Sequence, residues 1–71
     1  MKINSPMTAS VWRILVTAGD SVAAGQSLLI LESMKMEIPV EAPIAGTVQE
    51  IHVEEEEQVA QNALLMTLSE A

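Results

Sequence analysis

The amino-acid sequence predicts an all-β domain, a small sandwich or flattened barrel made of two similar halves. Short runs of β-branched and aliphatic residues are bounded by turn formers such as Gly19-Asp20 and Gln61-Asn62. No stretch has a long helical period, and the sequence aligns with itself. The length of 71 residues leaves room for one domain, which we assign to residues 1–71.

The internal repeat has a spacing of 37 residues, the separation of Pro6 from Pro43. A unit of roughly 30 residues cannot bury its own apolar face, so the two halves should pack together about a pseudo-twofold axis. They join at Met34 to Glu37. The other aligned identities are Val11 with Val48, Ile14 with Ile51, Val16 with Val53, Val22 with Val59, Ala23 with Ala60, Leu28 with Leu65 and Leu31 with Leu68.

Five segments are expected to form strands. Leu28 to Leu31 does not alternate, which is typical of a strand buried on both faces. Val48 and Ile51 are both apolar but differ in parity, which predicts a bulge or a strong twist between them. The expected strands are, in chain order, Val11–Val16, Ser27–Leu31, Ile38–Val40, Val48–Val53 and Ala63–Leu68.

The two halves differ at positions that should face solvent. In the second half these are Gln49, Glu50 and His52, whereas the first half has Trp12 and Leu15 where Gln49 and His52 stand. One interpretation is that neighbouring residues cover the two apolar side chains. The alternative is an exposed docking patch for a partner.

Composition excludes several classes of function. A formal net charge of −7 repels nucleic acid and anionic membranes, and Trp12 is the only aromatic residue, so no base-stacking platform exists. Without cysteine there is no disulfide or thiolate metal site, and His52 has no second ligand type nearby. No catalytic nucleophile–base pair can be assembled. No membrane span or signal peptide is recognisable, so we expect a cytoplasmic protein.

Lys35 is the only lysine or arginine after Arg13, and it lies between two apolar runs. A lysine at a turn is well placed for covalent modification. If Met34-Lys35 is a two-residue turn, the apolar residues of the two runs match across the hairpin. The predicted register pairs Ser33 with Met36, Glu32 with Glu37, Leu31 with Ile38 and Leu29 with Val40.

This hairpin breaks two local rules. Two-residue turns favour Asn-Gly or similar pairs, because both residues need a positive φ, yet here the pair is Met34-Lys35. Glu32 and Glu37 are also like charges placed directly opposite each other, which destabilises a strand pair. Conflicts of this kind are expected at functional sites.

The segment Glu32-Ser33-Met34-Lys35-Met36-Glu37 resembles the attachment motif of biotinyl carrier domains, in which the lysine between two methionines carries biotin. The resemblance to this biotin/lipoyl attachment family covers essentially the whole chain. Ser5-Pro6-Met7 resembles its opening strand, Val11-Trp12 its second strand, and residues 42–48 the repeat of the opening. The resemblance implies a flattened barrel-sandwich of two four-stranded antiparallel sheets, with the lysine on a protruding hairpin.

Some residues depart from the repeat. Glu56-Glu57 stands where the first half has Gly19-Asp20, and Asn62 stands where it has Gly25. Asn tolerates the left-handed region, but Glu does so poorly, so we expect a different turn at Glu54 to Glu57. No inserted loop interrupts the first half, so the thumb of some acetyl-CoA carboxylase carriers is expected to be absent.

The resemblance also implies the chemistry. A biotin protein ligase would attach biotin to the Lys35 amine, and the arm would carry a carboxyl group from a biotin carboxylase to a carboxyltransferase. The chain would be a monomeric, non-catalytic carrier. Met34 and Met36 are expected to be recognised through their flexible thioethers. Glu32 and Glu37 are either solvated charges or ligase contacts, and Glu32 is the better candidate for steering the ligase.

Two alternatives remain open at this point. Lipoyl domains share the architecture but resemble Asp-Lys-Ala around their lysine, unlike Met34-Lys35-Met36. Unmodified barrel-sandwich domains of membrane-fusion adaptors lack a methionine-flanked turn lysine and lie within longer chains. The absence of a linker rich in proline and alanine after Met1 favours a free-standing protein.

Overall fold

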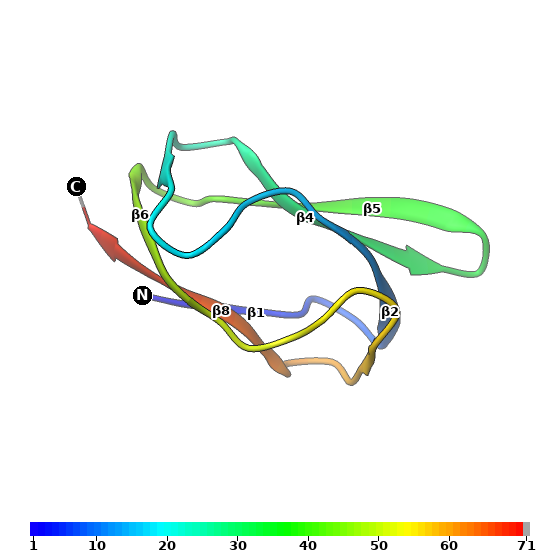
Figure 1. The fold of residues 1–71 in the computed structure, drawn as a ribbon. Helices are drawn as coiled ribbons and strands as arrows, with labels where there is room; N and C mark the ends of the chain where they lie inside the picture. The colour runs from blue at the N-terminus through cyan, green and yellow to red at the C-terminus, as the bar shows by residue number, and fades with distance from the viewer. Residues whose placement is uncertain (71) are drawn as a thin grey trace.

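The structure, a computed structural model, describes residues 1–70. These residues form eight β-strands (Figure 1) and contain no helix, so this part of the chain has no helix that could cross a membrane. The strands are β1 Lys2–Asn4, β2 Ala9–Ile14, β3 Ser21–Val22, β4 Ser27–Ser33, β5 Met36–Glu41, β6 Gly46–Ile51, β7 Gln58–Val59 and β8 Leu64–Glu70.

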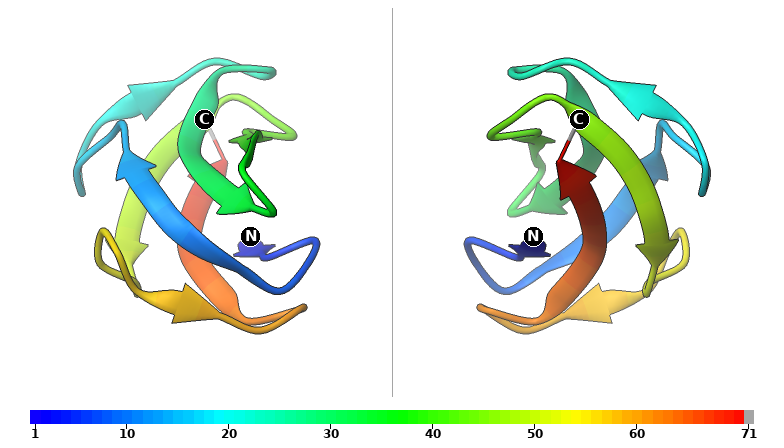
Figure 2. Two further views of the ribbon diagram at one scale, coloured as in Figure 1. Left: turned by 90° about the vertical axis from the view of Figure 1, so that its right-hand side faces the viewer. Right: turned by 90° about the vertical axis from the view of Figure 1, so that its left-hand side faces the viewer.

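The strands form two four-stranded antiparallel sheets, in the orders β1-β8-β6-β3 and β5-β4-β2-β7. The sheets curve around one core, as the end views show (Figure 2). The molecule is elongated, with extents of 34 × 18 × 17 Å. The β4–β5 hairpin lies at one end of the long axis and the N-terminus at the other (Figure 1). The predicted all-β barrel-sandwich is confirmed.

Backbone hydrogen bonds repeat between the halves and confirm the pseudo-twofold relation. The Val11 amide donates to the Glu57 carbonyl at 2.8 Å, and the equivalent Val48 amide donates to the Asp20 carbonyl at 2.8 Å. In return, Gly19 donates to Val48 at 2.8 Å and Glu56 donates to Val11 at 2.6 Å. The turn of each half is thus bonded to the long strand of the other half. Neither half can complete its backbone hydrogen bonding alone.

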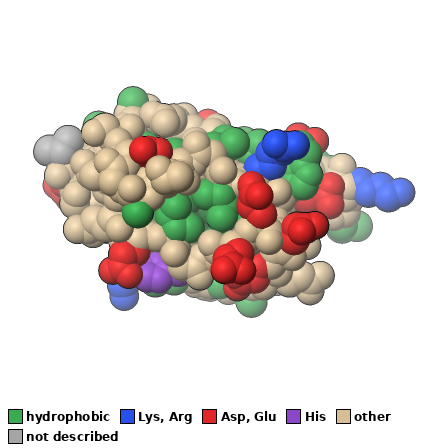
Figure 3. All heavy atoms as spheres, viewed as in Figure 1, with side chains coloured by type: hydrophobic (Ala, Val, Ile, Leu, Met, Phe, Trp, Pro, Cys, Tyr) green, Lys and Arg blue, Asp and Glu red, His purple; other side chains and the backbone are tan. Residues whose placement is uncertain are grey.

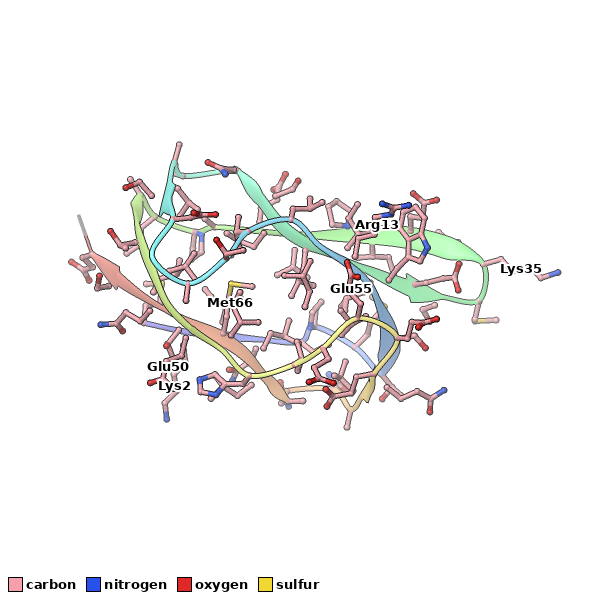
Figure 4. The ribbon with its side chains drawn as sticks, in the orientation of Figure 1. Lys2, Arg13, Lys35, Glu50, Glu55 and Met66 are labelled. Carbon is pink, nitrogen blue, oxygen red and sulfur yellow. The ribbon has the colours of Figure 1, made fainter. Side chains whose placement is uncertain are left out.

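Equivalent residues from β4 and β8 form the centre of the core. Leu28, Leu29 and Leu31 of β4 are completely buried. A register irregularity between Ser27 and Leu29 allows the consecutive residues Leu28 and Leu29 both to be buried. Ile30 is only half-buried. The expectation that β4 is buried on both faces therefore holds only in part. Burial of each such side chain contributes about 1.5–3 kcal/mol. The matching core residues of β8 are Leu65, Met66 and Leu68, and Met66 lies at the centre of the barrel (Figure 4).

The expected bulge is present in both halves. The register shifts between Val48 and Glu50 in β6, and between Val11 and Arg13 in β2. Gln49, Glu50 and His52 are exposed, as predicted. The bulges therefore turn equivalent residues outward on opposite sheets.

Several strand boundaries differ from the expected ones. The second and sixth strands each begin and end two residues earlier than predicted, because the chain leaves the sheet after Ile14 and after Ile51. The short strands β1, β3 and β7 have too few residues to show a pattern in sequence. The opening strand is β1, and Ser5 to Met7 form a turn in which the Ser5 hydroxyl donates to the Met7 carbonyl at 2.6 Å.

The turn at Glu54 to Glu57 has the same conformation as the equivalent turn of the first half, so our expectation of a different turn is wrong. Glu56 has a φ of 72°, close in character to the 97° of its equivalent Gly19. The Glu57 side chain accepts from the Glu54 amide at 3.0 Å, as Asp20 accepts from Thr17 at 2.9 Å. The bond from the Glu56 amide to Val11 holds the chain in this conformation, so a tertiary contact outweighs the local preference of glutamate.

We predict that Glu56→Gly raises the free energy of unfolding. A non-glycine residue in the left-handed region costs about 1–2 kcal/mol, and the added freedom of glycine in the unfolded chain offsets part of this, so the net gain should be about 0.5–1 kcal/mol. Urea unfolding would measure it. Gly19→Ala is the matched control and should lower stability, since the space around Gly19 is open and only the φ of 97° opposes a side chain. A loss of stability in Glu56→Gly would contradict this account.

Candidate functional site

The five residues singled out in the sequence all lie on one hairpin. β4 and β5 pair in the predicted register, with Ser33 opposite Met36 and Glu32 opposite Glu37. Further in, the pairs Leu31–Ile38 and Leu29–Val40 anchor the hairpin to the core. The hairpin extends beyond the rest of the barrel, and the Lys35 side chain points away from it at the tip (Figure 4).

The turn of this hairpin is held in an unfavourable backbone conformation. Met34 has a φ of 52° and Lys35 a φ of 67°. Two successive positive φ values are those of a type I′ turn, in which Asn and Gly are the favoured residues. Each non-glycine residue in this region costs about 1–2 kcal/mol. The predicted conflict in the turn is therefore confirmed, and the firmly paired strands on either side keep the turn in place.

The turn presents apolar and charged groups to water together. Met34 is 92% exposed and Met36 is 66% exposed, the two highest values among the large hydrophobic side chains. Lys35 is exposed between them. Two thioethers left in solvent contribute nothing to the core, so their placement favours contact with another molecule.

Acidic residues surround the base of the hairpin. Glu32 and Glu37 are exposed and directly opposite each other. Acidic side chains also gather on the face between the hairpin and the barrel (Figure 3). One of them, Glu55, accepts a hydrogen bond from the Ile14 amide at 3.0 Å. Any molecule that approaches Lys35 along this face therefore meets negative charge.

Trp12 and Leu15 are not covered by their neighbours. Trp12 is 39% exposed and Leu15 is 49% exposed, so the interpretation that local packing hides them is wrong. Their role as a docking patch stays a prediction. The Arg13 guanidinium lies 5.0 Å from the centre of the Trp12 ring, within the range of a cation–π contact.

Sequence reasoning gave no role to two residues close to the hairpin, Ser10 and Glu56. Both line a shallow groove together with Trp12 and Glu32. Ser10 lies opposite Glu32 in the β2–β4 pair, which brings the groove to the base of the hairpin. The signal in the sequence is the glutamate at position 56, where the repeat has Gly19.

The turn of the hairpin presents one amine nucleophile, that of Lys35. The Lys35 amine can form an amide with an activated carboxyl group once it has lost its proton. No cluster of three histidine or acidic side chains that could hold a metal ion occurs within residues 1–70. The hairpin is thus suited to being modified by another protein.

Comparison with known proteins identifies the family. The family model described as "Biotin-requiring enzyme" matches residues 1–68. The chain is 41% identical to the biotin/lipoyl attachment protein of Bacillus subtilis over 97% of this chain and 94% of that protein. It is 42% identical to the biotin carboxyl carrier protein of Streptococcus mutans over 92% of this chain and 50% of that protein.

The fold has the same relatives. The chain superimposes on part of the urea carboxylase of Kluyveromyces lactis with a TM-score of 0.91 and 29% identity, over 97% of this chain and 6% of that enzyme. The chain therefore corresponds to nearly all of one relative, half of another and a small part of a large carboxylase. The exposed turn lysine, the repeat and these matches together place this chain in the family of the biotin-requiring enzymes.

Proposed function

We propose that this chain is a biotin carboxyl carrier and that Lys35 is its attachment residue. The observation that carries the proposal is the exposed Met34-Lys35-Met36 turn at the tip of a protruding hairpin, in a member of a biotin-requiring family. The deprotonated Lys35 amine forms an amide with the carboxyl group of biotin after the ligase has activated that group with ATP, and the activating AMP group leaves. When bound, biotin supplies a ureido ring that accepts and releases a carboxyl group.

The residues of the chain contribute position rather than chemistry. The paired strands β4 and β5 hold the amine at the end of the molecule, where enzyme active sites can admit it. A lysine amine is protonated at neutral pH, so the enzyme that attaches biotin must remove the proton. Tethering then raises the concentration of biotin at a partner's site to the millimolar range. The chain itself is non-catalytic.

The proposal includes the partners. A biotin protein ligase acts on Lys35, with Met34 and Met36 as apolar contacts and Glu32 as the charge that orients the encounter. A biotin carboxylase and a carboxyltransferase are the two enzymes between which the arm moves. The carrier works as a monomer, because a net charge of −7 disfavours self-association. We propose the cytoplasm as its location.

A lipoyl carrier is the second candidate function. The observation that favours it is the similarity to a Bacillus subtilis protein whose name includes both biotin and lipoyl attachment. A lipoyl group would be linked to the same amine through the same kind of amide. The two methionines beside Lys35 favour biotin, because lipoyl domains resemble Asp-Lys-Ala around their lysine.

The attachment can be tested by intact mass. The chain incubated with a biotin protein ligase, ATP and biotin should gain one biotinyl group, and Lys35→Arg should gain none. Lys2 serves as an internal control, because it lies in β1 and should stay unmodified. No gain in the wild type, or a gain in Lys35→Arg, would refute the assignment. A lipoyl group gained with a lipoate ligase, and no biotinyl group with the biotin ligase, would establish the second candidate.

A substitution that relieves the strain in the turn should raise the free energy of unfolding and at the same time slow biotinylation. Asn tolerates a positive φ, so Met34→Asn should raise the free energy of unfolding by about 0.5–1 kcal/mol. The same change removes an exposed thioether and should lower kcat/KM for biotinylation at least about tenfold, or about 1.4 kcal/mol of transition-state binding. Met36→Asn is the control, since Met36 is not among the positive-φ residues and should give no gain in stability. Equal stability changes in the two variants would contradict the strain argument.

Glu32 and Glu37 carry the same charge but should differ in their effect on the rate of biotinylation. Glu32→Gln and Glu37→Gln each remove one member of a facing like-charge pair, so each should stabilise the hairpin by about 0.2–1 kcal/mol. Only Glu32→Gln should slow biotinylation, and the difference should shrink at high salt, because the charge acts through steering. Equal slowing by both variants would show that the ligase reads total charge instead of Glu32.

A further inference from the structure

A groove of about 230 Å³ lies beside the lysine hairpin, and Glu32 is the only residue of its lining that has a role in the function proposed above. Its lining comes from β2, β4 and the turn before β7, namely Ser10, Val11, Trp12, Glu32 and Glu56. Ligand pockets are usually larger, roughly 300–1,000 Å³, so this groove suits a ring-sized group. It is open to solvent on the side of the sheet that carries Glu32.

The pseudo-twofold relation provides an internal comparison. The position equivalent to Trp12 holds Gln49, and the position equivalent to Glu32 holds Ser69. The position equivalent to Glu56 holds Gly19. At these three positions, an indole and two carboxylates are therefore present only beside the sheet that carries the Lys35 hairpin. The general requirements of the fold do not explain this difference, because the second copy meets them without these side chains.

Glu56 adds a separate argument. Its φ of 72° is unfavourable for glutamate, and the equivalent position holds a glycine, which avoids the strain. Glu56 is one of the residues that line the groove. A strained residue at an open site is a reason to look for a ligand there.

We propose that this groove receives the bicyclic ring of the biotinyl group on Lys35 of the same molecule, while the arm is outside an enzyme. The inference rests on the carrier function proposed above. Glu32 is three residues from Lys35, roughly 10 Å along a strand. The modified side chain has roughly eleven bonds between the Lys35 Cα and the ring, on the order of 14 Å when extended, so the ring reaches the groove.

The chemistry of the groove fits this ring. The ureido group has two N–H donors, and the Glu32 and Glu56 carboxylates are acceptors. The indole of Trp12 offers an apolar surface for the rest of the bicycle.

Weak binding is sufficient in this arrangement. A short flexible tether gives an effective concentration in the millimolar range. A groove with a dissociation constant of about 1 mM is then roughly half occupied, while free biotin at cellular concentration does not fill it. The arm stays available to enzymes, because half occupancy lowers the accessible fraction only about twofold.

Trp12 makes the proposal directly measurable. It is the only tryptophan and the chain has no tyrosine, so the intrinsic fluorescence comes from the groove alone. We expect full biotinylation, verified by intact mass, to shift the emission to shorter wavelength. The acrylamide quenching constant should fall by roughly one third to one half, in line with half occupancy. Lys35→Arg treated in the same way should show neither change.

Two variants control for indirect effects. The double substitution Trp12→Gln with Gln49→Trp moves the indole to the equivalent bulge on the other sheet, and its emission should not respond to biotinylation. Glu56→Gly should reduce the response of Trp12 by more than half, although the same substitution is expected to stabilise the fold. A lost response in Glu56→Gly therefore cannot be attributed to unfolding.

A second readout does not depend on fluorescence. Streptavidin binds only the released ring, so Glu56→Gly and Trp12→Gln should each raise the association rate of the biotinylated chain with streptavidin about twofold. Unchanged quenching together with unchanged association rates, in a chain that intact mass shows to be biotinylated, would overturn the groove proposal and leave the carrier function standing. That outcome would favour a basic side chain of a partner as the occupant. No gain in mass would overturn both proposals.

Discussion

The exchange of backbone hydrogen bonds between the two halves is the constraint on which the rest of the molecule depends. The turn of each half donates to and accepts from the long strand of the other, through Val11 with Glu56 and Glu57, and through Val48 with Gly19 and Asp20. A chain of 71 residues has a small core, and it gains rigidity because these bonds close the barrel. The bonds also fix two turns in a left-handed conformation, whether glycine is available or not.

A closed barrel of this kind can tolerate a strained hairpin at one end. The pair β4–β5 has its equivalent in β8–β1, where the Leu68 amide donates to the Met1 carbonyl at 2.8 Å. The turn at Met34-Lys35 has no equivalent, because no turn joins β8 to β1. Strain at this turn therefore disturbs none of the repeated contacts. The proposed attachment residue, Lys35, therefore lies where the symmetry of the fold places no requirement on the sequence.

The repeat and the hairpin register could be predicted from the sequence, because each depends on matched apolar residues. Leu31 opposite Ile38 and Leu29 opposite Val40 are sufficient to fix the pairing of β4 with β5. The turn at Glu54 to Glu57 was predicted wrongly, since the bond from Glu56 to Val11 connects residues far apart in sequence. The sequence also left open whether Trp12 is exposed or covered. The bulge in β2 determines which way its side chain faces, and this bulge depends on the pairing of β2 with β4.

The differences between the halves are more informative about function than their similarities. A carrier must release its cofactor to two enzymes, so a resting site on the carrier has to bind weakly and lie within reach of the arm. A groove between Trp12, Glu32 and Glu56 meets both conditions, since it is open to solvent and Glu32 in its lining is three residues from Lys35. The cost of glutamate at position 56 then has a physical explanation. The barrel can hold a strained residue there, and the proposed biotinyl ring would give its carboxylate a hydrogen-bond donor.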